Sequence, residues 1–161
     1  MNSFTSSVAI DDGYCGGIWK LDKDLTMQFT KAEEYGIFGI MYLATQPKGK
    51  ITPLSEISEN QSVPEKFLAK IFQSLSKSGL IRSHRGVRGG FTLGRPAEKI
   101  SVKDVVEAIQ GPYRISKCLT EPLDSQSPAA AALRQLLIKA QDSLLTVFSS
   151  HTIKDLTDWQ D

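Results

Sequence analysis

Apolar residues recur at helical spacing in five stretches of the chain, and each stretch begins with a serine or threonine. A side-chain oxygen at that position can accept a hydrogen bond from a free amide of the first turn, which marks a helix start. The pattern predicts helices that begin at Thr30, Thr52, Ser62, Ser101 and Ser127. An acidic residue follows Thr30, Ser62 and Ser101 by three positions, which is the spacing of a capping box.

The helix that begins at Ser62 has one apolar and one basic side. Its expected buried stripe consists of Phe67, Leu68, Ile71 and Leu75. Its expected polar face consists of Lys66, Lys70, Gln73 and Lys77. The preceding helix turns Leu54 and Ile57 inward, and Gly79 is expected to end the second helix. Together they predict a helix–turn–helix with a basic outer face.

Two short strands follow in the stretch LIRSHRGVRGGFTL. The glycines between them (Gly86, Gly89 and Gly90) form the expected turn of a hairpin. This narrow tip can approach a surface closely, and its arginines can bind phosphate there. The stretch lacks the patterns of a P-loop and of a dinucleotide fingerprint, so the alternative is an ordinary solvated hairpin. Directly after a basic helix, a hairpin of this kind is typical of the wing of a DNA-binding domain.

The last predicted helix carries apolar residues at alternating intervals of four and three, the spacing of a heptad seam. They are Leu133, Leu137, Ala140, Leu144 and Val147. The stripe could pack on its own domain or on a second subunit. We expect a dimerisation helix, because the smaller domain before it already has enough apolar residues for a core of its own.

The net charge of the chain does not indicate a nucleic-acid partner, but the charge of one short region does. The 161-residue chain has a net charge of +1. Between residues 62 and 96, however, Glu65 is the single acid, against bases at Lys66, Lys70, Lys77, Arg82, Arg85, Arg88 and Arg95. Such a basic region within a nearly neutral chain is the pattern expected of a nucleic-acid-binding surface.

Other classes of protein find less support in the sequence. Two distant cysteines, Cys15 and Cys118, do not form a disulfide framework, and no apolar run reaches the length of a membrane span. We therefore expect a cytoplasmic protein without a membrane partner. No catalytic triad, carboxylate pair or phosphate loop indicates an enzyme. The alternative to DNA binding is a winged-helix adaptor that acts through protein–protein contacts.

The order of these motifs resembles a known family. The segments MQFTKAEEYGIFGIMYLA, RGVRGGFTLGRP and VVEAIQGP are similar to those of the Rrf-two family of bacterial transcriptional regulators, over residues 27 to about 158. The resemblance implies a mainly α fold: a winged helix-turn-helix with a two-stranded β wing and a long C-terminal dimerisation helix. We expect a mobile tail over 1–26, the DNA-binding domain over 27–111, a sensor-type loop over 112–128 and the dimerisation helix with the C-terminal segment over 129–161.

The resemblance also implies a function and the residues that carry it out. The expected protein is a homodimeric regulator, a repressor in our interpretation, that binds a promoter palindrome in double-stranded DNA. The residues expected at the DNA are Pro64, Lys66, Phe67, Lys70, Gln73, Arg85 and Arg88. Ala69 stands where some cluster-sensing members carry a glutamate, and Val87–Arg88 replace the usual Pro–Gly of the wing tip.

The signal is left open by the sequence. Cluster-binding relatives have three cysteines before the dimerisation helix, whereas only Cys118 matches here. It could be an iron–sulfur ligand together with Glu34, a redox thiol or a packing residue, and a small-molecule or protein effector is a further alternative. Glu34 could equally be a solvated carboxylate at a helix N-terminus. We therefore expect no cofactor, with a cluster as the alternative. The isolated His84 and His151 are expected to be solvated.

Overall fold

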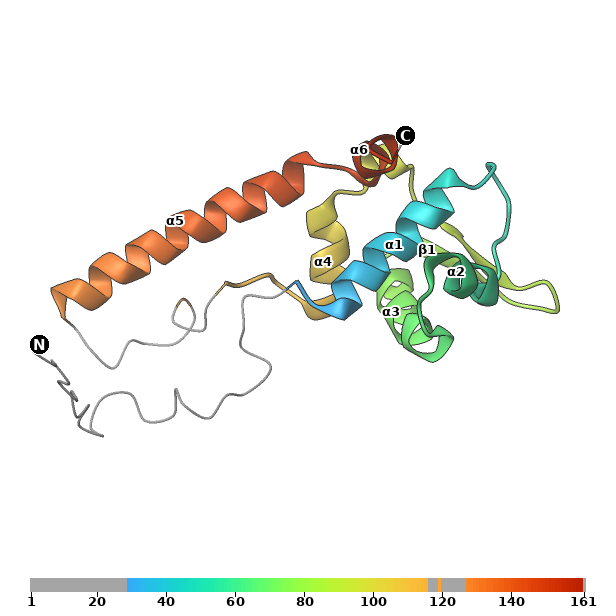
Figure 1. Ribbon diagram of the computed structural model, residues 1–161, viewed down its shortest axis with the longest axis horizontal. Helices are drawn as coiled ribbons and strands as arrows, with labels where there is room; N and C mark the ends of the chain where they lie inside the picture. Colours follow the sequence, from blue (N-terminus) through green and yellow to red (C-terminus); the bar gives the residue numbers. More distant parts are fainter. Residues whose placement is uncertain (1–28, 116–118, 120–126, 161) are drawn as a thin grey trace, which may run out of the picture.

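The computed structural model describes residues 29–115, 119 and 127–160, so the predicted tail over 1–26 and Cys118 lie outside the described residues. Helices dominate, with one two-stranded antiparallel sheet (Figure 1). The elements are α1 (Lys31–Thr45), α2 (Leu54–Gln61), α3 (Glu65–Lys77), β1 (Ile81–His84), β2 (Gly90–Leu93), the 3-10 helix η1 (Ala97–Lys99), α4 (Val102–Gln110), α5 (Pro128–Ser150) and α6 (Ile153–Asp158).

Helix α1 lies at the centre of the body and packs against α2, α3, α4 and α6. Its predicted capping box is present, since the Thr30 side chain accepts from the Glu33 amide and the Glu33 carboxylate accepts from the Thr30 amide. Gly39 allows α3 to approach closely, because a Cβ there would lie 2.6 Å from Phe72 Cε2. The largest fully buried side chains include Ile40, Ile57, Phe72, Leu75, Val105 and Ile153.

Two predicted helix starts are wrong. Thr52 is not an N-cap: it is fully buried in extended chain, and its backbone pairs with Phe91 of β2, so α2 begins at Leu54 after Pro53. Ser62 does not begin α3 with a capping box, because it has φ 53°, ψ 39° and ends α2 in the left-handed conformation. An N-cap needs an extended backbone. The next helix therefore starts at Glu65, after Pro64.

The end of α3 and the wing follow the prediction closely. Gly79 has φ +73° and completes a Schellman motif, in which Leu80 N donates to Leu75 O at 3.0 Å and Gly79 N to Ser76 O at 3.1 Å. Strands β1 and β2 then pair antiparallel from Ile81↔Leu93 to His84↔Gly90. Because β1 begins at Ile81, directly after this motif, the two hydrogen bonds that end α3 also fix the start of the wing.

Helix α5 extends from the body as a single rod (Figure 1). It begins as predicted, with Ser127 as N-cap and Pro128 in the first turn. Near its other end, the ring of Phe148 packs edge-on against Tyr113 and Phe29, with centroids 5.8 and 6.0 Å apart. The chain then returns to the body, where Ile153 of α6 is fully buried. Among the helices that the structure describes, none is long and apolar enough to span a membrane.

Candidate nucleic-acid interface

The outer face of α3 is basic, as the spacing of its residues predicts. Lys66, Lys70, Gln73 and Lys77 are all exposed. The opposite side is buried in the core by Leu68, Ile71, Phe72 and Leu75, which follow the i, i+3, i+4, i+7 pattern of a core-facing stripe. The helix therefore presents its charged side to solvent while its apolar side anchors it to α1.

The prediction that Phe67 belongs to the buried stripe of α3 is wrong. Its side chain is 46% exposed, and Phe72 takes the core position instead, with no exposed surface. The reason is the angular position around the helix. Phe67 lies just outside the sector that points into the core, whereas Phe72 lies within it and packs against the backbone of Gly39, which has no side chain. The ring of Phe67 packs edge-on against Tyr35 of α1, with centroids 5.9 Å apart and planes at 89°.

The wing adds further cations beside α3. Arg82, Arg85 and Arg88 are exposed, and Val87 at the tip is fully exposed. Across the hairpin, the half-buried His84 is hydrogen-bonded through Nε2 to Thr92 Oγ1 at 3.0 Å. A shallow groove between the end of α3 and β1 is lined by Ser76, Gly79, Ile81, Arg82, Ser83, His84, Arg85 and Gly94.

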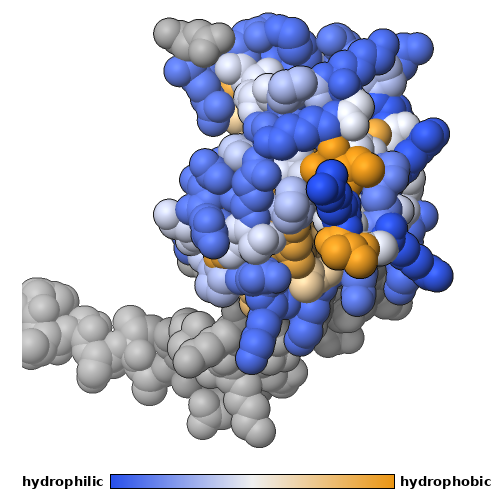
Figure 2. Space-filling view, turned by 90° about the vertical axis from the view of Figure 1, so that its right-hand side faces the viewer, coloured by the Kyte–Doolittle hydropathy of each residue, from blue (hydrophilic) through white to orange (hydrophobic). Residues whose placement is uncertain are grey.

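These cations have no carboxylate partners in the described part of the chain. Ion pairs there join Lys31 to Glu34, Lys50 to Glu56, Arg95 to Asp104 and Lys154 to Asp158. The bases of α3 and of the wing take part in none of them. The wing lies at the end of the body away from α5, and the face seen there is mainly hydrophilic (Figures 1 and 2). Unpaired cations on adjoining elements form a surface suited to a polyanion.

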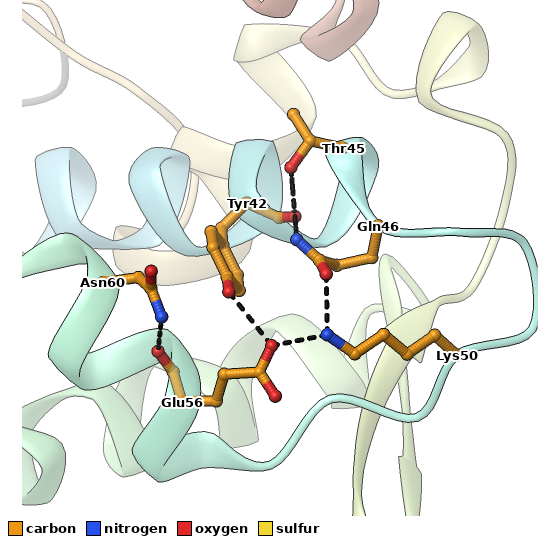
Figure 3. A network of polar contacts seen from close by, with 6 residues as sticks. All are labelled: Tyr42, Thr45, Gln46, Lys50, Glu56 and Asn60. Atoms are coloured by element: carbon orange, nitrogen blue, oxygen red, sulfur yellow. Dashed lines mark hydrogen bonds and ion pairs between the residues drawn. The ribbon is translucent and has the colours of Figure 1, made fainter.

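A polar network joins α1 to α2, without any signal for it in the sequence (Figure 3). Glu56 Oε1 accepts from Tyr42 Oη at 3.0 Å and from Lys50 Nζ at 2.6 Å. Lys50 Nζ also donates to Gln46 Oε1 at 2.8 Å. The bond from Lys50, and next that from Tyr42, lowers the pKa of Glu56. Burial and the bond to Glu56 raise the pKa of Tyr42. Tyr42 and Glu56 are 14 positions apart, so no local spacing rule could have found their contact.

The donors for a cofactor do not converge in the described residues. Glu34 is half-buried and paired with Lys31 at 2.6 Å, and no group of three His, Cys, Asp or Glu side chains suited to a metal occurs within the ranges the structure describes. The Nδ1 atom of His151 is hydrogen-bonded to Val147 O at 2.8 Å. Cys118, the one sulfur donor predicted for a site, lies outside these ranges.

The helix-turn-helix, the wing and the basic surface have counterparts in known proteins. The model of the Rrf2 (Rrf-two) family, described as an iron-dependent transcriptional regulator, matches residues 29–159. The chain belongs to this family. Rrf2 proteins are transcriptional regulators and generally not enzymes, so this chain is a DNA-binding transcriptional regulator. The family predicted from the sequence motifs is confirmed.

Solved Rrf2 structures share the architecture. CymR (YrzC), the global cysteine regulator of B. subtilis, is 27% identical, with a TM-score of 0.71 over 84% of this chain and 100% of that chain. The oxidized form of Staphylococcus aureus CymR is 30% identical, with a TM-score of 0.67 over 81% and 96%. T. potens IscR, at 24% identity and a TM-score of 0.68 over 84% and 89%, shows the fold alone. The predicted winged helix-turn-helix fold is confirmed.

Proposed function

We propose that this regulator is a homodimeric repressor in the bacterial cytoplasm and that it binds a palindromic operator in double-stranded DNA. The observation that carries the proposal is the exposed basic surface made by α3 and the wing, whose cations have no carboxylate partner among the described residues. In this arrangement α3 enters the major groove with Pro64, Lys66, Phe67, Lys70 and Gln73, which all lie on the exposed side of the helix or at its start. Arg85 and Arg88 reach the backbone or the minor groove from the wing, since arginine is favoured where that groove is narrow.

Helix α5 supports a dimer because several of its apolar side chains are left exposed by the rest of the described chain. None of its 23 residues is buried. Leu133, Leu136 and Val147 are 56%, 64% and 51% exposed and lie along one side. Leu137 and Leu144, which belong to the same predicted seam, are half-buried. We assign the partner surface to the exposed edge of this seam, at Leu133, Leu136 and Val147, and the dimerisation role to residues 129–161.

The preceding segment, residues 112–128, is proposed as the sensor. Its described parts touch α5 directly: Ile115 N donates to Gln141 Oε1 at 3.3 Å, and Arg134 Nη2 donates to Leu119 O at 3.5 Å. A chemical change in this segment can therefore alter the position of α5. We propose the thiol of Cys118 as the reactive group, since a thiolate beside Lys117 can be oxidised without a cofactor.

The test is selection of bound sequences from a random duplex library with the full chain, followed by titrations at two salt concentrations. Two inverted half-sites among the selected sequences would support the dimer and the palindrome. Lys66→Ala or Lys70→Ala should cost about 1–3 kcal/mol more on the selected duplex than on random DNA, if either side chain reaches a base edge. An adaptor would instead enrich no sequence and show no salt-dependent affinity for DNA.

A further inference from the structure

Phe67 is an exposed aromatic side chain in the middle of a charged surface. It follows Lys66 directly, lies three residues before Lys70, and is 46% exposed. An exposed ring of this size gains nothing from water, whereas a ring that covers an apolar group on a partner is stabilised. We therefore expect the exposed ring of Phe67 to contact an apolar group of the molecule that binds α3.

The direction of the Phe67 ring is fixed from behind. Tyr35 of α1 meets it edge-on, with planes at 89°, which is a favoured geometry for aromatic pairs. Tyr35 is itself half-buried and packs against the core cluster. One side of the ring is thus supported by the body of the protein while the remaining surface is presented outward.

The major groove offers one apolar group at its base edges, the 5-methyl of thymine. A phenylalanine ring can neither donate nor accept a conventional hydrogen bond, so it cannot read the nitrogen and oxygen atoms that identify the other bases. The neighbouring lysines supply charge and hydrogen bonds instead. The chemistry of this position therefore matches a thymine methyl group.

We propose that Phe67 is a specificity-determining residue that contacts the methyl group of a thymine in each half-site, and that Tyr35 is its positioning residue. The inference rests on the proposed function, because it needs α3 in the major groove. It adds the group that α3 recognises in the groove, a thymine methyl, and the residue of α1 that holds Phe67 in position, Tyr35.

The experiment removes the methyl group alone. Each thymine of the selected half-site is replaced in turn by deoxyuridine, symmetrically in both halves, and the full chain is titrated with each labelled duplex. At one position the wild-type affinity should fall about fourfold per half-site, the change that corresponds to one methyl-sized apolar group. Phe67→Ala should bind the thymine and uracil duplexes equally. Lys66→Ala, the matched control, should weaken both and keep their ratio.

Tyr35 is tested with two variants. Tyr35→Leu should reduce the preference for thymine over uracil, and Tyr35→Phe should restore it, because the ring rather than the hydroxyl meets Phe67. A merely structural role would weaken binding to both duplexes without changing their ratio. Melting followed by circular dichroism checks that the variants fold.

Three results would overturn the inference: no uracil duplex binds more weakly than its thymine parent, the selected half-site has no thymine, or Phe67→Ala keeps the full preference. A preference kept by Tyr35→Leu would overturn the role of Tyr35. Failure of the selection to enrich any sequence is a different outcome, since it would refute the proposed function itself and favour a protein partner for this surface.

Discussion

Thr52 and Phe91 exchange both of their backbone hydrogen bonds, with Thr52 N donating to Phe91 O at 3.0 Å and Phe91 N to Thr52 O at 2.8 Å. The segment that leads into α2 is thereby joined to the returning strand of the wing. The helix-turn-helix and the hairpin, the two parts proposed to face DNA, are thus joined by this pair of backbone hydrogen bonds as well as by the covalent chain through Gly79.

Gly90 is the position where this connection can be tested. A Cβ there would lie 2.4 Å from the carbonyl oxygen of Thr52. Gly90→Ala should force the two segments apart and lower the free energy of unfolding by about 1–3 kcal/mol, in the range of other overpacked sites. Thermal melting measures the loss. The control is Val87→Ala at the fully exposed tip, which should melt like wild type.

Removal of the wing arginines should weaken binding to all DNA sequences alike. Phosphate contacts position a protein without reading sequence. Arg85→Ala should therefore reduce the slope of log K against log salt by about one unit for each phosphate that the variant no longer binds, or about two per dimer, and Arg88→Ala likewise if it touches a phosphate. Lys139→Ala, on the polar side of α5, removes the same charge and should keep the wild-type slope. A wild-type slope in both arginine variants would exclude the wing from the interface.

Charge on the exposed side of α5 should separate the subunits. Leu133→Asp combined with Leu136→Asp places carboxylates in the proposed partner surface, and sedimentation should show a monomer at micromolar concentration with weakened operator binding. Gln135→Asp lies between them on another side of the helix and should remain dimeric. A wild-type protein that is itself monomeric at that concentration would contradict the proposed dimer.

The network around Glu56 should be visible in its titration. Because the pKa of Glu56 is lowered in the folded protein, its contribution to stability is present above the unfolded pKa and is lost as pH falls through the folded pKa. Lys50→Met removes the largest cause and should raise the pKa of Glu56 toward its ordinary value. Carbon-13 NMR of the side-chain carboxyl measures it. Lys48→Met, two residues earlier in the loop, should leave the titration of Glu56 unchanged.

Thiol chemistry, rather than metal removal, should release this regulator from DNA. A mild thiol oxidant should weaken operator binding of the wild type but not of Cys118→Ser, while a chelator should affect neither. Absorbance of protein purified without oxygen provides an independent check. Visible bands with stoichiometric iron that disappear together with DNA binding would show that a cluster is the sensor instead.

The parts of the fold that depend on local chemistry could be predicted from the sequence. The caps at Thr30, Ser101 and Ser127, the basic face of α3 and the turn at Gly79 each follow from neighbours within a few residues. What could not be predicted depends on distant partners. Thr52 has the right identity for an N-cap, but pairing with Phe91 holds it in extended chain. Phe67 lies beside the buried stripe in sequence but outside its angular sector, whereas Phe72 enters the core against Gly39. Among the wing glycines, Gly86 has φ +117°, while the close contacts of Gly89 and Gly90 are what exclude a side chain there.

Because α5 packs against the body near one end, a small rotation there produces a large displacement of its other end. Its 23 residues span about 34 Å, and the aromatic contacts of Phe148 with Tyr113 and Phe29 lie near one end. A rotation of about 10° at this joint moves the far end by about 6 Å, at the 1.5 Å rise per residue of an α-helix. In a dimer joined through α5, such a shift is a sizeable part of the roughly 34 Å that separates half-sites one helical turn apart. In the proposed dimer, small changes in packing at the joint therefore alter the distance between the two α3 helices, and with it the operator spacing that they fit.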